Sequence, residues 1–351
     1  MTRFALAGFG FRAAAYHRLS RALPDLRCVG AVVRHPQGRE LPVPTFGDLS
    51  DCVRATGPDF LITAVPRTAN AGLISEAVSL GLPVLAETPP ATDLAGLREL
   101  WTEVGKSGQV QIAEQYLLMP AHAARRNAVR SGIIGTPTQV QVSSTQQHHA
   151  MSLIRGLLGA GHATASVRAV RTVAPLLNPL DRSGWTDDEE PRPATTTIAT
   201  LDFGDGRSAV YDFTTNQTRN LLRSRRLLVR GTHGELHDDT IVHMPAARTV
   251  TRTPLVRRQS GHDLDLNGFD TETIALGDRV VYRNPFPGLR LNDDEIATLT
   301  LLSAMLTWVR GEGPPPYPLA EGLQDQALAL AVEESAETGR EILTRLEAWS
   351  C

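Results

Sequence analysis

The first thirteen residues constrain the fold of this chain more than any other segment. An apolar run, Phe4–Ala7, leads into Gly8-Phe9-Gly10-Phe11-Arg12-Ala13, and an alanine-rich helical segment follows to Leu23. This order of strand, tight turn and helix is typical of dinucleotide binding. Gly8 permits the turn, Gly10 lets the backbone approach a pyrophosphate, and Ala13 lets helix and strand pack closely. The amides that open the helix then face the phosphates.

Strands and helices alternate through the first third of the chain. Apolar segments typical of strands are Leu26–Val33, Asp59–Val65, Pro83–Ala86 and Gln109–Ala113. Helical segments lie between them at Asp48–Ala55, Thr68–Leu80 and Thr92–Lys106. Such alternation implies parallel crossover units. We therefore predict an α/β fold, with a Rossmann-type doubly wound parallel sheet over residues 1–119.

The pattern changes near Pro120. A helix is expected over Ala121–Arg130, and β-rich segments then dominate: Thr138–Thr145, Ser166–Val173, Thr195–Phe203, Arg207–Thr215, Arg226–Arg230 and Glu235–His237. Further helices are expected at His149–Leu158, Asp293–Val309 and Leu319–Leu346. Residues 120–351 are thus predicted to form an α+β domain with a large, mainly antiparallel sheet. We interpret the acidic segment Asn178–Pro193 as a surface loop, although it is also placed to lie over a site.

Composition excludes several classes of protein. A chain of 351 residues favours two domains, and a net charge of −3 gives no reason to expect nucleic acid or an anionic membrane as a partner. No apolar run approaches a membrane span of about 20 residues, and no secretory leader is apparent. Three scattered cysteines fit a reducing, cytoplasmic location. We expect no metal site, because the glycines around His233 and His237 favour a turn and strand over a ligating helix.

Four motifs resemble the Gfo/Idh/MocA oxidoreductase family. They are the N-terminal fingerprint; Thr63-Ala64-Val65-Pro66 followed by Gly81–Pro89, similar to the family's Glu-Lys-Pro strand end; Gly132-Ile133-Ile134-Gly135; and His149-x-x-x-Leu153-x-Arg155. The resemblance implies hydride transfer between a nicotinamide and a small sugar, polyol or imine. It also implies a homodimer or homotetramer. The cofactor is then expected at Gly8, Phe9, Gly10, Phe11, Arg12, Arg34, Val65, Pro66, Glu87 and Thr88.

The resemblance fails at two of the family's three proton-handling residues. Thr88 stands where the family has lysine, and Thr145 stands where it has aspartate, so that only His149 remains. A threonine hydroxyl is neutral and supplies no charge. The only lysine in the chain, Lys106, lies at the end of a predicted helix, where a solvated side chain is expected.

Other residues are candidates to replace the missing groups. We expect His149, with Tyr116 or His148, to handle the proton, because histidine titrates near neutral pH and Tyr116 follows a strand of the parallel sheet. Gln115, Thr145 and Arg155 are candidate substrate-binding residues, although Arg155 also suits a surface ion pair.

A polar cluster at Asn216, Gln217, Arg219 and Asn220 has the residue types that bind sugars or carboxylates, and it fits an ordinary loop equally well.

The residue that would select the nucleotide is Arg34. It stands 21 positions after Ala13, where an acidic residue would bind the ribose of NAD. An arginine there suits a 2′-phosphate, with His35 and Arg39 close by. We therefore expect NADP, with NAD as the alternative.

Three functions remain open at this stage. They are an oxidoreductase with atypical acid/base residues, a nucleotide-binding protein without activity, and an enzyme that uses nicotinamide transiently to cleave glycosides.

Overall fold

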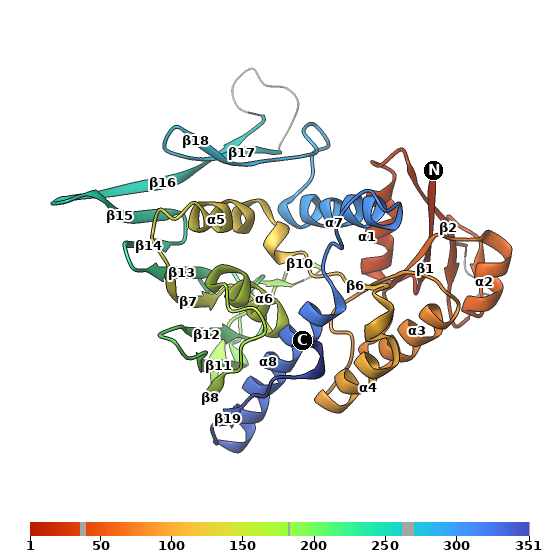
Figure 1. Ribbon diagram of the computed structural model, residues 1–351, viewed down its shortest axis with the longest axis horizontal. Helices are drawn as coiled ribbons and strands as arrows, with labels where there is room; N and C mark the ends of the chain where they lie inside the picture. The colour runs from red at the N-terminus through yellow and green to blue at the C-terminus, as the bar shows by residue number, and fades with distance from the viewer. Residues whose placement is uncertain (36–39, 182, 262–269, 351) are drawn as a thin grey trace.

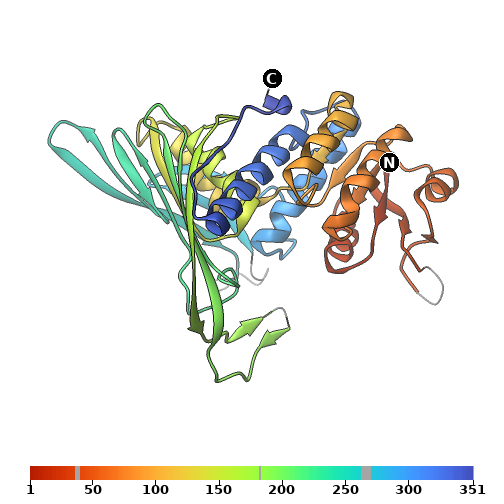
Figure 2. The ribbon, with the colours of Figure 1, turned by 90° about the horizontal axis from the view of Figure 1, so that it is seen from below.

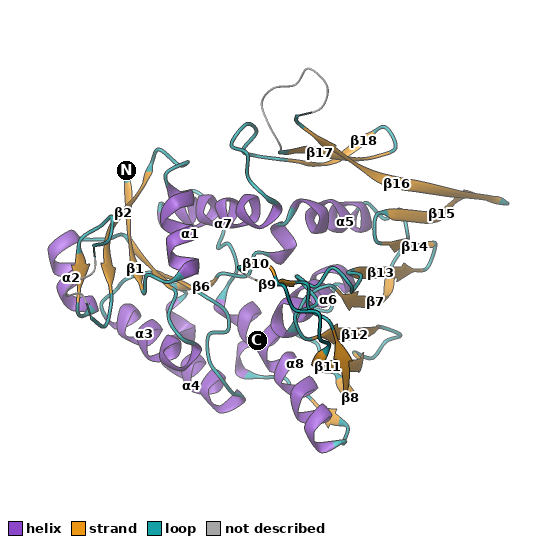
Figure 3. Cartoon of the chain, turned by 180° about the vertical axis from the view of Figure 1, so that it is seen from behind, coloured by secondary structure: helices purple, strands orange, loops and turns teal. Residues whose placement is uncertain are grey.

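The computed structural model describes residues 1–35, 40–181, 183–261 and 270–350. Two sheets form the framework, one in the N-terminal third and one in the rest of the chain, and most helices lie between them (Figures 1 and 3). Within the described residues, no helix is both long and apolar enough to cross a membrane.

The N-terminal sheet is parallel and has the strand order β3-β2-β1-β4-β5-β6. This is the Rossmann order, and it confirms the predicted α/β class. Its strands are β1 (Thr2–Ala7), β2 (Leu26–Val32), β3 (Thr45–Phe46), β4 (Phe60–Thr63), β5 (Val84–Ala86) and β6 (Val110–Ile112). Its helices are α1 (Phe11–Ser20), α2 (Leu49–Thr56), α3 (Arg67–Ser79) and α4 (Leu94–Val104).

The register of the parallel sheet brings four strand ends to one edge. Ala7 of β1 pairs with Thr63 of β4, Thr63 pairs with Ala86 of β5, and Ala86 pairs with Ile112 of β6. The residues that follow these strands therefore meet at the carboxyl edge of the sheet. In open α/β sheets this edge binds the ligand.

The second sheet has the order β18-β17-β16-β15-β14-β13-β7-β12-β11-β8-β19. It is antiparallel except where β7 pairs with β12, so the predicted mainly antiparallel sheet is confirmed. Its strands are β7 (Pro137–Ser143), β8 (Ser166–Leu176), β11 (Arg192–Asp202), β12 (Ser208–Thr214), β13 (Arg226–Gly231), β14 (Gly234–His237), β15 (Thr240–Ala246), β16 (Thr249–Gln259), β17 (Thr271–Leu276), β18 (Arg279–Arg283) and β19 (Ile342–Leu343).

Helices cover one face of this sheet, on the side of the N-terminal domain (Figure 2). They are α5 (Pro120–Arg130), α6 (Gln147–Leu158) and α8 (Leu319–Thr338). The last helix is predicted to run to Leu346, but α8 ends at Thr338. Gly339, with a left-handed φ of 67°, caps it, and β19 follows. Strands β15–β18 were not predicted; of these, β16 and β18 are polar and rich in arginine.

The chain returns to the N-terminal domain after the second sheet. Leu299 and Met305 of α7 (Asp293–Val309) share a buried cluster with Phe4 and Tyr16. Helix α8 is fastened to β6 by the backbone hydrogen bond from Ile112 N to Tyr317 O, 2.8 Å. The division at 119/120 stays a prediction, and these later helices complete the core of the first domain.

Candidate active site

A cleft of about 1650 Å³ lies where the carboxyl edge of the parallel sheet meets the second domain. The fingerprint turn, the ends of β5 and β6, the start of α6 and the turn after β12 all contribute to its lining. This volume exceeds the roughly 300–1000 Å³ of a drug-sized pocket.

The fingerprint turn fits a dinucleotide. Gly8 has a φ of +86°, and a Cβ built on it would lie 2.4 Å from the carbonyl oxygen of Ala64, so only glycine is accommodated there. Gly10 is exposed, and a Cβ on it would meet no atom within 4 Å. The backbone at Gly10 is therefore open to the close approach of a phosphate at the start of α1. Val65 and Pro66 follow β4 on the same edge.

An ion-pair cluster fixes the next part of this edge. Arg12 donates from Nε to Glu87 at 2.7 Å and from Nη1 to Asp294 at 3.1 Å, and Tyr16 donates to Glu87 at 2.5 Å. The charges of Tyr16, Glu87 and Asp294 outweigh burial and raise the pKa of Arg12, so the guanidinium stays charged. Its Nη2 atom is buried without a hydrogen-bond partner. Arg12 and Glu87 are thus anchored to each other beside Thr88.

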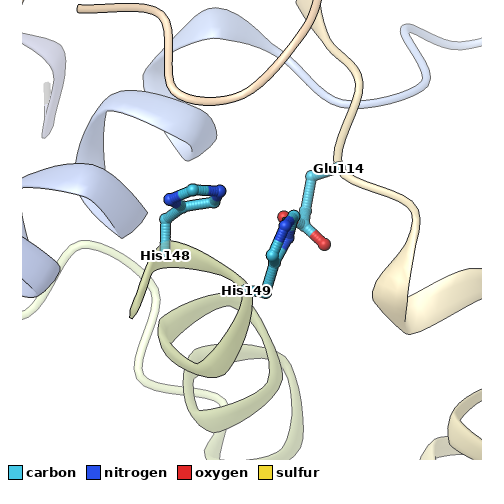
Figure 4. Close-up of side chains that lie close together, drawn as sticks. All are labelled: Glu114, His148 and His149. Carbon is cyan, nitrogen blue, oxygen red and sulfur yellow. The ribbon is translucent and has the colours of Figure 1, made fainter. Parts of the chain in front are cut away.

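The centre of the cleft holds a hydrogen-bonded carboxylate and histidine. Glu114 follows β6, and His149 lies in the first turn of α6. The two side chains point toward each other (Figure 4), with Nδ1 of His149 2.6 Å from Oε2 of Glu114. The other carboxylate oxygen of Glu114 accepts from the backbone N–H of Tyr116 at 2.9 Å. Glu114 is only 2% exposed, so this bond forms away from bulk water.

The charge state of Glu114 sets the tautomer of His149. Burial acts to raise the pKa of Glu114, but the facing His149, His148 and the Tyr116 N–H outweigh it and lower that pKa. An ionised carboxylate only accepts hydrogen bonds, so Nδ1 of His149 carries the hydrogen. The remaining nitrogen, Nε2, is then the atom that can take or give a proton in the cleft.

Aromatic rings stack along this part of the cleft. The centroid of the Tyr116 ring lies 4.3 Å from that of His149 and 6.3 Å from that of His122, and the centroids of His148 and His149 are 4.2 Å apart. Burial raises the pKa of Tyr116, and the charge of Glu114 adds to this. Burial lowers the pKa of His148 to about 3, so His148 is neutral and is a poor proton donor near pH 7.

The same three side chains offer a possible set of metal ligands. One donor atom from each of Glu114, His148 and His149 lies within 4.8 Å of the others. Glu114 and His149 are bonded directly to each other, through Oε2 and Nδ1. As it stands, the arrangement is that of a hydrogen-bonded pair, and we interpret it so.

One predicted substrate-binding residue, Arg155, lies outside the cleft lining. Arg155 is 4% exposed, and its guanidinium donates to Glu321 at 2.6 Å and to Asp325 at 2.5 Å. The guanidinium of Arg155 is therefore occupied by these acidic partners. Thr145 is fully buried between Ser144 and Gln146 of the cleft lining, with its side chain next to that of Tyr116, so its part in substrate binding stays a prediction. Gln115 does line the cleft, where it donates to Asp294 at 2.9 Å.

The acidic segment interpreted as a surface loop lies at the cleft. Within Asn178–Pro193 the chain forms a short hairpin of β9 (Leu180–Asp181) and β10 (Gly184–Trp185), and Asn178, Asp181 and Ser183 contribute to the lining. On the nucleotide side, Arg34 is exposed directly after β2. The predicted helper Arg39 lies outside the described residues.

Glu114 is not predicted from the sequence. The resemblance leads one to expect a carboxylate partner of His149 four residues earlier, at position 145, whereas the structure supplies it from the end of β6. The available signal was its position: Glu114 directly follows an apolar strand of the parallel sheet, next to Gln115 and Tyr116, which were both singled out.

Comparisons with known proteins agree with this geometry. Residues 2–115 match the model of the Gfo/Idh/MocA oxidoreductase family, NAD-binding Rossmann fold. Residues 2–115 therefore carry the NAD-binding Rossmann fold of that oxidoreductase family. No curated protein sequence matches the chain.

Solved structures resemble the whole chain. An oxidoreductase from Agrobacterium radiobacter, in complex with NAD+, L-tartaric acid and magnesium, has 16% identity, a TM-score of 0.69 and coverage of 97% and 98% of the two chains. A myo-inositol dehydrogenase from Corynebacterium glutamicum has 18% identity, a TM-score of 0.68 and coverage of 98% of this chain and 99% of the other. The WlbA dehydrogenase from Bordetella pertussis, in complex with NADH and UDP-GlcNAcA, has 19% identity, a TM-score of 0.67 and coverage of 98% of each chain. At these identities the likeness establishes a shared fold.

Alanine substitutions at the two fingerprint glycines are predicted to affect different properties, stability at Gly8 and nucleotide affinity at Gly10. Gly8→Ala places a methyl against the Ala64 carbonyl at a left-handed φ, so we expect a loss of about 2 kcal/mol or more in the free energy of unfolding. Gly10→Ala meets no protein atom and fills the space next to the helix amides. It is expected to keep the stability and to weaken nucleotide binding about tenfold or more. Urea unfolding and calorimetric titration with NAD+ and NADP+ measure both effects, and equal nucleotide affinity in Gly10→Ala and wild type would reject the phosphate site.

Burial of His148 predicts a pH-dependent stability. Its pKa is about 3 when folded and about 6.5 when unfolded, so only the unfolded chain binds this proton between those values. The contribution is complete above pH 6.5 and falls as the pH drops toward 3, by at most about 1.4 kcal/mol per pH unit. Urea unfolding between pH 7.5 and 4.5 should give a flatter pH dependence for His148→Gln than for wild type. The exposed His237→Gln is the control, and parallel curves for His148→Gln and wild type would contradict the assignment.

Proposed function

We propose that this protein is a nicotinamide-dependent oxidoreductase that transfers a hydride to or from a small sugar, polyol or imine, with the Glu114–His149 pair handling the proton. The observation that carries the proposal is the 2.6 Å bond between these two residues, next to the carboxyl edge of the parallel sheet. The family of the nucleotide-binding domain and the open backbone at Gly10 support a nicotinamide dinucleotide as the partner.

The bound nicotinamide supplies or accepts the hydride. The residues of this chain supply position and proton transfer. His149, with Nδ1–H held by Glu114, takes a hydroxyl proton at Nε2 during oxidation or returns one during reduction. Glu114 stays ionised and stabilises the imidazolium that forms. Gln115 and Tyr116, which line the same wall, are placed to orient the substrate hydroxyls.

The pair also bears on the competing functions. A nucleotide-binding protein without activity has no need for a buried carboxylate aligned on a histidine in the cleft, because such a carboxylate costs free energy to desolvate. The loss of lysine and aspartate at Thr88 and Thr145 is thus offset by a carboxylate from another strand. A glycoside-cleaving enzyme would use the same residues, and it is distinguished by product formation without net reduction of the nicotinamide.

The pair predicts non-additive losses of activity. His149→Ala removes the acid/base group and should lower kcat/KM by several hundred-fold or more, and Glu114→Gln should lower it at least tenfold because the tautomer is no longer fixed. If the two residues act as a unit, the double variant loses little beyond His149→Ala alone.

The assay is reduced-nicotinamide absorbance over a panel of sugars, polyols and imines. The matched control is His122→Gln, a ring of the same stack without a bond to Glu114. A His149→Ala variant within threefold of wild type would falsify the role of His149.

We propose NADP(H) as the preferred nucleotide, with NAD(H) as the alternative. Support comes from Arg34, exposed at the end of β2 where an acidic residue would bind the ribose of NAD. The NAD+ and NADH bound in two structures of similar fold favour the alternative.

Replacement of Arg34 separates the two nucleotides. Arg34→Asp should weaken NADP(H) binding far more than NAD(H) binding, since a guanidinium pairs with a 2′-phosphate and a carboxylate repels it. Fluorescence titration with both reduced nucleotides measures the ratio, and equal changes in the two affinities would reject the NADP assignment.

We also propose a homodimer or homotetramer, formed through the open face of the second sheet. Large apolar side chains are exposed on β8, β11 and β16, at Val170, Ile198, Val250 and Val256. Exposed apolar side chains gathered on one sheet face are typical of an interface between protein chains.

A further inference from the structure

Most acidic side chains that line the cleft are already neutralised by arginine. Asp294 and Glu87 pair with Arg12, Asp293 pairs with Arg257 at 2.7 Å, and Asp239 pairs with Arg125 at 2.9 Å. Two other carboxylates accept from backbone N–H groups: Asp238 from Leu227 at 2.8 Å, and the exposed Asp181 from Ser183 at 2.6 Å. These carboxylates therefore do not form an unpaired negative surface in the cleft.

Two arginines that line the same cleft have no acidic partner among the described residues. In the part of the chain that the structure describes, the guanidinium groups of Arg219 and Arg225 make no hydrogen bond and no ion pair, whereas the other cleft arginines do. Arg219 is half-buried and Arg225 is exposed. A partly desolvated cation without a partner is costly, and an anion that enters the cleft would remove that cost.

The turn that carries Arg219 is held firmly in place. Gln217 is 3% exposed, and its amide donates to the backbone oxygens of Ser143 and Ser224, both at 2.9 Å. Asn220 donates to Leu177 O at 2.8 Å, and Asn216 donates to Asn178 at 2.6 Å. These bonds tie the turn to the end of β7, just before α6, and to the chain that enters the β9–β10 hairpin.

The free cations flank the proposed reaction centre. The charge of Arg219 acts to lower the pKa of Tyr116, and the charge of Arg225 helps burial to lower the pKa of His122, so each arginine lies near one of these rings. Tyr116 stacks directly on His149. An anionic group bound at Arg219 would therefore lie in the same cleft as His149, on the side of Tyr116.

We propose that the substrate is an acid: a small polyhydroxylated molecule whose carboxylate or phosphate binds Arg219, with Arg225 as a second positive charge. This rests on the proposed function and deepens it, since it narrows the substrate class from neutral polyols to anionic ones. The planar guanidinium of Arg219 holds an oxyanion through two parallel hydrogen bonds, which fixes orientation as well as affinity.

The test compares matched anionic and neutral ligands by calorimetric titration of the protein loaded with nicotinamide dinucleotide. The pairs are gluconate with glucitol, glycerate with glycerol, and glucitol 6-phosphate with glucitol. The first two report a carboxylate and the third a phosphate. In at least one pair the anion should bind about tenfold or more tighter, and Arg219→Gln should remove most of that difference.

The matched control is Arg223→Gln. Arg223 is exposed in the same segment, outside the cleft lining, and donates to Leu222 O at 3.2 Å, so its removal should leave the preference for the anion intact. The proposal is overturned if no anion is preferred in any pair, or if the preference survives in Arg219→Gln. Failure of the proposed function is a separate outcome: anions then bind through Arg219, but no hydride transfer depends on His149.

Discussion

The hydrogen bond between Glu114 and His149 is the interaction on which the rest of the site depends. It joins the end of β6 in the parallel sheet to the first turn of α6 in the second domain, so it forms only when both domains are folded and correctly placed. A carboxylate that is 2% exposed needs strong partners, and Glu114 has two: His149 and the N–H of Tyr116. Because the charged form is stabilised there, one tautomer of His149 is selected and Nε2 remains for chemistry.

Charged side chains are arranged around this bond. Thr88, which follows β5, and Thr145, which precedes α6, are neutral and contribute no charge there. The structure places a carboxylate at Glu114 and keeps a guanidinium at Arg12, which Glu87 and Asp294 hold beside Thr88. The side of the cleft near Tyr116 remains positive through Arg219. Among the residues that the structure describes, the cleft is lined by a fixed histidine and by arginines, and by no lysine.

The sequence predicted what depends on local patterns. The fingerprint glycines, the alternation of strands and helices, and the end of each apolar strand together predict the parallel sheet and the residues along its carboxyl edge. Gln115 and Tyr116 are predicted in this way, His149 and its neighbour His148 are predicted from the family resemblance, and the structure brings all four to one cleft.

What the sequence could not predict depends on contacts between distant segments. Glu114 pairs with a histidine 35 positions away, and Arg155 pairs with Asp325, 170 positions away. The second contact occupies the guanidinium of Arg155, which the sequence analysis predicts to bind substrate. Of the unpredicted strands β15–β18, β16 and β18 lack a clear apolar alternation because they carry several arginines and many exposed positions.

The most direct test of the central claim is the tautomer of His149, which nuclear magnetic resonance of protein labelled with ¹⁵N-histidine reports without knowledge of the substrate. The signal is assigned by its loss in His149→Gln. We predict a hydrogen on Nδ1, with a strongly downfield proton resonance that disappears in Glu114→Gln and persists in the control His122→Gln. A neutral His149 with its hydrogen on Nε2, or a resonance unchanged by Glu114→Gln, would contradict the account.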